Sequence, residues 1–394
     1  MTSKMLRSQL TKAEVEIAST ECIDLGAGYP TTPRTPEILD LWDRSFHQAI
    51  RDDLTAQSRR KATEDVIASV LHFLGLDQRV LKCSMMATGS AALDVAIRAA
   101  VEPGKTVVMG SPIIDLVPSM VTGLRSSSMT VVQPMTGGMR IDYAQVAGTV
   151  RRSKPGACVV VSPVNPTGQL ATRDELADLA SACASVGAVL VADQCFSAVS
   201  PWGRDVPHVA HLQENFPELD WLEVWDTGKT FGLNDMKIGF VICSPRLADR
   251  VEKQLQIIQF DLPHVTKLLF RSLLDDGALI QEILRYNHAA VLENLTQLQR
   301  FAPSWSLTVP TPDAGNLAMT IADSKTSLGQ HQSHRRLLLE ARVGVVNGAT
   351  FLFSRTGRPR TVSGRKLLRF ALARDPAYFL RGLERIDSWI ANAG

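Results

Sequence analysis

Four short runs rich in valine lie in the first half of the chain, separated by stretches with helical spacing. The runs are Thr106–Met109, Thr130–Val132, Ala157–Val161 and Ala188–Ala192. A strand that is apolar along its whole length is typical of a parallel sheet with helices on both faces, because neither face of that strand meets water. Ligands of such sheets gather at the carboxyl ends of the strands. The sequence therefore predicts an α/β fold with a ligand site at that end of the sheet.

Three polar residues fall just past the ends of apolar runs: Asn165, Asp193 and Lys229. Lys229 belongs to Trp225–Phe240, a bend rich in Gly, Thr and Asn between two apolar runs. Loops at such places often carry catalytic or binding residues. A lysine in a polar loop is more often a solvated charge. Because a carboxylate and an amide converge on the same end of the sheet, we interpret Lys229 as an amine that could form an imine.

A helix begins where another strand ends, at Thr88-Gly89-Ser90-Ala91. The first turn of a helix offers free backbone NH groups and a partial positive charge, and small residues let a ligand approach them closely. This combination suits a phosphate dianion, although a Gly-Ser turn alone is weak evidence.

Size and charge narrow the classes of function. The chain has 394 residues, enough for two lobes with a large core, and its 42 Lys and Arg nearly balance its 40 Asp and Glu. This balance removes the general electrostatic case for nucleic acid or an anionic membrane as partner. Without a membrane-length apolar run or a signal-peptide core, the sequence predicts a cytoplasmic protein.

Cysteine and histidine give no sign of a metal site. The six cysteines lie in apolar segments without CxxC spacing, so we expect neither a disulfide nor zinc. Two histidine pairs, His208/His211 and His331/His334, are spaced for one helix face but lack a recognisable third ligand.

In order and separation, the segments around Thr88, Asn165, Asp193 and Lys229 resemble the class I/II aminotransferases, which are fold type I of the enzymes that depend on pyridoxal 5'-phosphate (PLP). The resemblance covers nearly the whole chain. It implies a mostly parallel seven-stranded sheet in a large PLP-binding domain at residues 46–265 and a smaller α/β domain at 266–394. It also implies an N-terminal arm and lid at 1–45, which packs with the small domain, and a homodimer.

The same resemblance assigns roles to individual residues. Lys229 would hold the cofactor as an internal aldimine and move the substrate Cα proton, and Asp193 would pair with the pyridinium nitrogen. Asn165 would donate to the phenolic oxygen of the ring, and Arg369 would clamp the substrate carboxylate. The remaining cofactor contacts would come from Thr88, Gly89, Ser90, Ala91, Phe196, Thr227 and Lys237.

Three residues depart from the usual family pattern. Phe196 stands where most members have a tyrosine that contacts the cofactor oxygen, and Lys237 stands where an arginine usually holds the phosphate. Asp226 replaces a serine just before the lysine. Because phosphate would repel a carboxylate, we expect Asp226 to turn away from it, towards a cationic group of the substrate. The aromatic residue that commonly stacks on the ring is replaced around Ile113–Asp115.

The N-terminal segment has two interpretations. Thr11-x-x-Glu14 fits a capping box, in which side chain and backbone of the two residues bond reciprocally. Alternatively, the helix is a lid, and Thr11 and Glu14 meet the substrate, Glu14 through a cationic group. The Gly/Pro turn that follows, Asp24–Pro30, lines the substrate pocket in the family, which places Tyr29 near the substrate.

The departures are similar to those of PLP-dependent arginine oxidases and cyclases of natural-product biosynthesis. The matching positions are Thr11, Glu14, Asp193, Phe196, Asp226, Lys229, Lys237 and Arg369. Tyr29 stands where those oxidases use a histidine, which puts reaction with oxygen in doubt. We therefore expect an enzyme that forms an external aldimine with an amino acid, removes the Cα proton and uses the quinonoid for oxidation, elimination or cyclisation. An ordinary aminotransferase and a degenerate binding protein are the alternatives.

Overall fold

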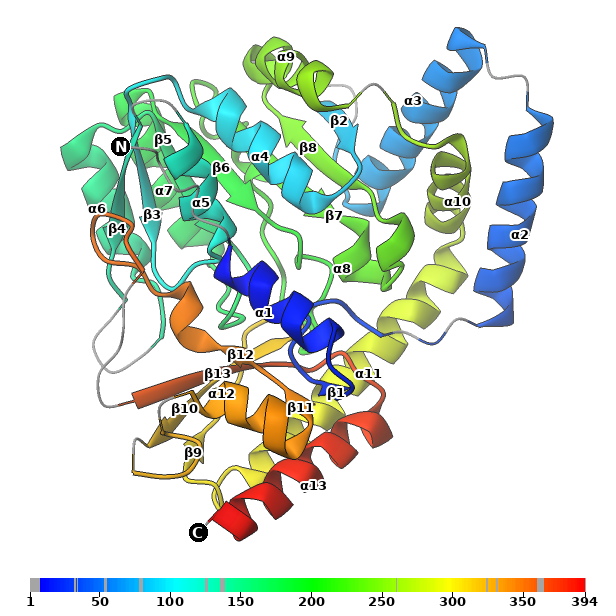
Figure 1. The fold of residues 1–394 in the computed structure, drawn as a ribbon. Helices are drawn as coiled ribbons and strands as arrows, with labels where there is room; N and C mark the ends of the chain where they lie inside the picture. Colours follow the sequence, from blue (N-terminus) through cyan, green and yellow to red (C-terminus); the bar gives the residue numbers. More distant parts are fainter. Residues whose placement is uncertain are drawn as a thin grey trace.

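The computed structural model describes residues 8–31, 33, 35–52, 55–77, 81–124, 127–134, 139–259, 261–323, 325–330, 332–359 and 365–393. A seven-stranded sheet forms the larger part of it (Figure 1). Its strands are β2 (Lys82–Met86), β3 (Thr106–Gly110), β4 (Ser128–Val132), β5 (Ala157–Val161), β6 (Val189–Asp193), β7 (Trp221–Asp226) and β8 (Gly239–Cys243). Their order is β2-β8-β7-β6-β5-β3-β4, and only β8 runs antiparallel to its neighbours. The predicted mostly parallel sheet is confirmed.

Helices cover both faces of this sheet, as the apolar strands require. Val107 and Met109 point into one apolar cluster and Val108 into the other, so a single strand feeds two cores. One face is covered by α4 (Gly89–Ala100), α5 (Leu116–Gly123) and α9 (Ala248–Ile258). The other face is covered by α3 (Ala56–Phe73), α6 (Tyr143–Ser153), α7 (Arg173–Val186) and α10 (His264–Asp275), with α2 (Pro36–Arg51) packed on α10.

The C-terminal part is built on a four-stranded antiparallel sheet in the order β12-β13-β10-β9. Its strands are β9 (Leu307–Thr308), β10 (Leu317–Asp323), β12 (Val346–Asn347) and β13 (Arg365–Ala371). The long helix α11 (Gly277–Phe301) reaches this part from the core of the large sheet and packs on α13 (Pro376–Ala393) (Figure 1). Shorter elements are α12 (Ser333–Arg336), the π-helical turn Leu337–Ala341 and the 3-10 turns Val209–Leu212, Asn234–Met236, Pro245–Leu247 and Gly348–Phe351.

The N-terminal segment joins the two parts. β1 (Ile23–Asp24) pairs in parallel with β11 (Val343–Gly344), and α1 (Gln9–Ala18) lies between the two sheets (Figure 1). Leu10 and Ile17 of α1 pack with Met319 and Val346 of the smaller sheet. The division of the chain at residues 45 and 265 remains a prediction.

The helices between the two sheets are interrupted twice. α9 ends at Ile258 and α10 begins at His264, just after Pro263, and a second break separates α10 from α11. Asp276 ends the first helix and caps the second, its carboxylate accepting from Leu279 N at 3.0 Å. A cap of this kind stabilises a helix by about 1 kcal/mol. Among the described residues, no helix combines the length and apolar character needed to cross a bilayer.

Candidate active site

A cavity of about 250 Å³ lies at the carboxyl ends of the parallel strands, between the large sheet and α1. Polar side chains from both parts of the chain reach it: Asp193 ends β6, Asn165 follows β5, Lys229 lies in α8 (Thr227–Phe231) and Arg369 lies on β13. The cavity is lined by Leu10, Thr11, Glu14, Gly28, Tyr29, Gly89, Ser90, Leu93, Ile114, Leu116, Asn165, Asp193, Cys195, Phe196, Asp226, Lys229 and Arg369.

Asp226 joins the starts of two helices at one wall of the cavity. One carboxylate oxygen accepts from Lys229 N at 3.0 Å and the other from Gly89 N at 2.7 Å, so the same side chain caps α8 and binds the first amide of α4. Position 89 needs a glycine, because a Cβ there would lie 2.5 Å from Asp226 Oδ2. The expectation that Asp226 turns away from the phosphate site is therefore wrong. Its charge is drawn to the free amides of the two helix starts.

The Lys229 amine lies over aromatic rings. Nζ is 3.3 Å from the ring centroid of Tyr29 and 5.5 Å from that of Phe196, within the range of cation–π contact. Burial lowers the pKa of Lys229 below its ordinary value, although the Asp226 and Glu14 carboxylates oppose the effect. A larger fraction of the amine is therefore neutral, the form that can act as nucleophile or base, than in a solvated lysine.

Asp193 is a buried carboxylate with few partners. Cys195 N donates to Oδ1 at 3.1 Å, and no cation among the described residues lies within ion-pair distance of it. Burial raises the pKa of Asp193 because the ionised form loses its hydration. A cationic ligand group beside this carboxylate would relieve that cost.

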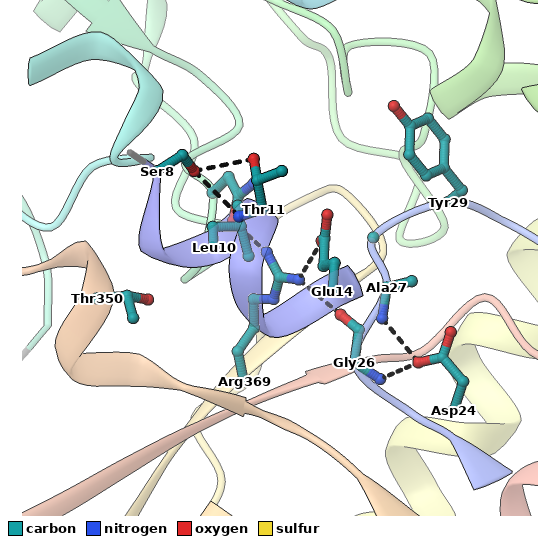
Figure 2. Close-up of polar contacts among 12 residues, drawn as sticks. Ser8, Leu10, Thr11, Glu14, Asp24, Gly26, Ala27, Tyr29, Thr350 and Arg369 are labelled. Carbon is teal, nitrogen blue, oxygen red and sulfur yellow. Dashed lines mark hydrogen bonds and ion pairs between the residues drawn. The ribbon is translucent and has the colours of Figure 1, made fainter. Parts of the chain in front are cut away.

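Arg369 is fully buried and connects three segments (Figure 2). Its guanidinium donates to Asn165 Oδ1 at 3.1 Å, Glu14 Oε1 at 3.0 Å and Gly26 O at 2.6 Å, while its Nε has no acceptor among the described residues. A guanidinium can only donate, so the amide oxygen of Asn165 must face it. The Asn165 NH₂ is thereby left to donate elsewhere.

The capping-box interpretation of Thr11 and Glu14 is wrong. Ser8 caps α1, and its Oγ accepts from Thr11 N at 3.0 Å, whereas the Glu14 carboxylate turns towards Arg369. The local pattern predicts the wrong contact for Glu14, because a long-range ion pair with a buried arginine outweighs a local bond to the backbone. The positions of Thr11 and Glu14 in the cavity wall agree with the alternative interpretation, a lid helix.

A second buried arginine shapes the loop that carries Tyr29. Arg374 donates through Nε to Asp24 O at 2.9 Å, through Nη1 to Tyr29 O at 2.5 Å, and also to Ala27 O. On the other side of the loop, Asp24 Oδ1 accepts from the amides of Gly26 and Ala27 (Figure 2). Sequence reasoning missed Arg374, and also the cavity-lining residues Leu10, Leu93, Leu116 and Cys195.

Four of the expected cofactor residues do not line the cavity: Thr88, Ala91, Thr227 and Lys237. The Thr88 hydroxyl accepts from Ala91 N at 3.0 Å and caps α4, and the Thr227 hydroxyl accepts from Ile238 N at 2.8 Å. Lys237 Nζ donates to Asn234 O at 3.1 Å and lies 4.8 Å from the Tyr29 ring centroid. Ser90, in contrast, is exposed at the cavity, and its amide has no acceptor in the part of the chain that the structure describes.

The histidine pairs lie elsewhere in the fold. His208 pairs with the buried Glu223, and the rings of His208 and His211 are 5.5 Å apart. His331 lies outside the described residues. All six cysteines are free thiols. Among the described residues, no group of three or more His, Cys, Asp or Glu is arranged to hold a metal.

Four features define the fold type I class of PLP-dependent proteins. The parallel sheet has one reversed strand, an amine follows β7, a carboxylate ends β6, and the start of α4 lies at the same cavity. The chain belongs to the aminotransferase class I and II family, whose sequence model matches residues 20–386. PLP is the cofactor of this family.

Known proteins agree with both the fold class and the family. Histidinol-phosphate aminotransferase of Chlorobium phaeovibrioides is 26% identical over 203 residues, which are 51% of this chain and 53% of that protein. The aligned chain thus spans about half the length of this curated relative. The methionine aminotransferase YbdL of Escherichia coli matches with a TM-score of 0.79 at 16% identity, covering 98% of each chain. A PLP-bound aminotransferase homologue of Clostridium difficile 630 matches with a TM-score of 0.78 at 17% identity, covering 98% of this chain and 97% of the other.

The residues around the cavity fit PLP. Asp193 is a buried carboxylate without a cation, which suits a protonated pyridine nitrogen, and the Lys229 amine lies in the same cavity. The Asn165 NH₂ is free to donate to a phenolate oxygen, because its carbonyl is held by Arg369. For the phosphate, the α4 start offers the Ser90 amide and hydroxyl, whereas the Gly89 amide is already bonded to Asp226.

Proposed function

We propose that this protein is a PLP-dependent enzyme that removes the Cα proton of an amino acid as part of a specialised biosynthetic reaction. The observation that carries the proposal is that Lys229, Asp193 and Arg369, from distant parts of the chain, line one cavity. PLP, when bound, supplies an aldehyde that condenses with amines and a ring that withdraws electrons from Cα.

Lys229 would act twice. Its amine would first hold the cofactor covalently and, after a substrate amine displaces it, take the Cα proton as general base. The lowered pKa of Lys229 supports the second role, because the base must be neutral near physiological pH.

Asp193 and Asn165 would hold the cofactor ring. The Asp193 carboxylate would keep a pyridine nitrogen protonated, since a buried anion beside a ring cation stabilises both charges. The Asn165 NH₂ would donate to the ring oxygen, where Phe196 brings no hydroxyl. The loss of that second donor supports a role other than routine transamination.

Arg369 would bind the substrate carboxylate in exchange for Glu14. The Glu14 carboxylate occupies Arg369 Nη2 at 3.0 Å, and a substrate carboxylate offers the same chemistry to the same donor. Released from Arg369, Glu14 would face the cavity as an unpaired anion. A substrate with a cationic side chain would supply its new partner, so we propose that a basic amino acid is the substrate.

An ordinary aminotransferase is the second candidate. It is favoured by the complete set of Lys229, Asp193, Asn165 and Arg369 at the cavity and by the aminotransferase names of the relatives. In this case the same proton removal would lead to transfer of the amino group to a keto acid.

One experiment separates the two candidates. The holoenzyme is incubated with a panel of amino acids in D₂O, with and without a keto acid, and products are identified by mass spectrometry. A basic amino acid that gains Cα deuterium and yields product in excess of the enzyme without the keto acid would support the specialised reaction. Product that exceeds one equivalent of the enzyme only when the keto acid is present would identify an aminotransferase. Lys229→Ala should abolish both, while the nearby Lys237→Ala should retain Cα exchange; exchange that persists without Lys229 contradicts the proposal.

A further inference from the structure

Asp115 binds the start of the lid helix. It lies in the connection between β3 and α5, and only 4% of it is exposed. Ser8 Oγ donates to its Oδ1 at 2.9 Å, and the amides of Gln9 and Leu10 donate to its Oδ2 at 2.5 and 3.0 Å. Although Asp115 stands in the N-cap position of α5, its side chain makes no capping bond there. Its carboxylate serves α1 instead, from more than a hundred residues along the chain.

These three hydrogen bonds occupy most of the acceptor sites of an ionised carboxylate. A carboxylate at a helix start accepts from free amides and meets the positive end of the helix dipole. Hydrogen bonds to a charged acceptor are stronger than those between neutral groups, and a buried carboxylate that loses its donors is costly. Asp115 therefore fixes the position of the first turn of α1.

The ion pair of Glu14 with Arg369 fixes α1 at a second point farther along the helix. The two contacts of α1 differ in how they lie relative to the cavity. Glu14 reaches Arg369 across the cavity wall, whereas Asp115 is absent from that wall although its neighbours Ile114 and Leu116 belong to it. A substrate carboxylate can therefore compete for Arg369 but cannot reach the bonds of Asp115. Once Arg369 has changed partner, the first turn of α1 is still fixed.

We infer that Asp115 is a positioning residue that keeps α1 over the cavity while Arg369 exchanges Glu14 for the substrate. The inference rests on the proposed function, in which Arg369 binds the substrate carboxylate. Asp115 touches neither substrate nor cofactor. It acts through α1, by keeping Leu10, Thr11 and Glu14 in the cavity wall after the ion pair has opened.

Hydrogen exchange of the backbone amides tests this directly on the holoenzyme. Asp115→Asn keeps the size of the side chain but removes its charge and places an NH₂ against donors. Amide exchange in residues 10–18 should then accelerate about tenfold or more, with the rest of the chain unchanged. Asp142→Asn is the matched control, because Asp142 caps α6 in the same way, accepting from Gln145 N at 2.9 Å. It should leave exchange in α1 unchanged.

A second variant removes the same acceptor in another way. Asp115→Ala removes the carboxylate without placing an NH₂ against the donors and leaves the Ser8 cap of α1 in place, so it should accelerate exchange in α1 in the same direction even if Asp115→Asn folds poorly. In steady-state kinetics, Asp115→Asn should raise KM for the amino acid while kcat changes less, because the lid is displaced but Lys229 and Asp193 are not. Unchanged exchange in α1 for both variants would overturn the inference. A wild-type protein that takes up no PLP would contradict the proposed function, and the exchange result would still decide the role of Asp115.

Discussion

At the scale of single residues, the proposed recognition of the substrate depends on the contact between Glu14 and Arg369. Their ion pair links α1 to the smaller sheet, and the arginine end is fully buried while the Glu14 side chain is 28% exposed. Breaking a partly buried pair by removing one partner leaves the other charge without compensation. The proposed exchange avoids this cost because the substrate carboxylate replaces the one that leaves.

Replacing Glu14 should therefore change substrate preference in two directions. In Glu14→Gln, KM for basic amino acids should rise about tenfold or more, because the anion that would meet the cationic side chain is gone. KM for neutral amino acids should fall, since no carboxylate competes for Arg369. Steady-state kinetics with a matched basic and neutral pair measures both values. Equal changes for the two substrates would mean that Glu14 does not face the side chain.

At the scale of elements, the loop 24–29 is rigid because its carbonyl groups converge on two buried guanidinium groups. Arg374 holds Asp24, Ala27 and Tyr29, and Arg369 holds Gly26. The loop in turn places the Tyr29 ring 3.3 Å from Lys229 Nζ. The stability of the smaller part and the geometry of the cavity therefore depend on the same residue.

Arg374→Lys should release the loop 24–29 from the hydrogen bonds that hold its carbonyl groups. An ammonium on a single stem cannot reach three carbonyl groups at once, so two of them lose their donor. We expect the free energy of unfolding to fall by about 3 kcal/mol, and Cα exchange to slow because Tyr29 shifts. Urea unfolding and the deuterium assay measure the two effects. Arg381→Lys, an exposed position on α13, is the control, and similar losses in both variants would argue against a specific role for Arg374.

The sequence predicted the elements well where the signal is local. The Val-rich runs became β3, β4, β5 and β6, and the polar residues at their ends mark the cavity. What it could not give are contacts between distant segments. Asp115 and Arg374 look like ordinary charges in the sequence, because their partners lie far along the chain. Glu14 was misread in the local interpretation for the same reason.

At the scale of the whole molecule, α2 carries an apolar stripe that stays largely exposed in the described part of the chain. Leu39, Trp42, Phe46 and Ile50 share one face of the helix and are 52%, 38%, 47% and 67% exposed. Ile38 and Leu41 of the same helix are buried. Exposed large apolar side chains in one contiguous row are typical of an interface. We propose that this face contributes to the homodimer expected of the family.

Charging this stripe should separate the subunits. The wild-type protein should be a dimer at micromolar concentration, and the double variant Trp42→Glu and Phe46→Glu should be a monomer, because two carboxylates would have to be buried at the interface. Light scattering coupled to gel filtration gives the masses. Leu339→Glu, at a position 53% exposed on another face, should remain dimeric. A monomeric wild-type protein contradicts the prediction.

Stability should also depend on pH through His208 and Glu223. Burial opposes the charge on His208, but the charge and hydrogen bond of Glu223 raise the pKa of the imidazole above its ordinary value. A histidine whose pKa is raised by folding stabilises the fold below its unfolded pKa of about 6.5, and this contribution is lost as pH rises through the folded pKa.

The difference in unfolding free energy between wild type and His208→Gln should therefore be greatest near pH 6 and shrink towards pH 9. Near pH 6 we expect about 3 kcal/mol, because the variant leaves the buried Glu223 without its cation. Urea unfolding at several pH values measures the difference. His47→Gln is the control, since His47 pairs with Asp43 on the surface and should show almost no effect. A difference that grows with pH would have the wrong sign.

The central claim is that Lys229, and not the neighbouring Lys237, holds PLP beside Asp193. Borohydride reduction of the PLP-loaded protein fixes the cofactor to the lysine that binds it, and peptide mass spectrometry identifies that lysine. We expect the pyridoxyl mass on the peptide containing Lys229, and none in Lys229→Ala treated in the same way. Label on Lys237 alone, or a protein that takes up no PLP, would contradict the account.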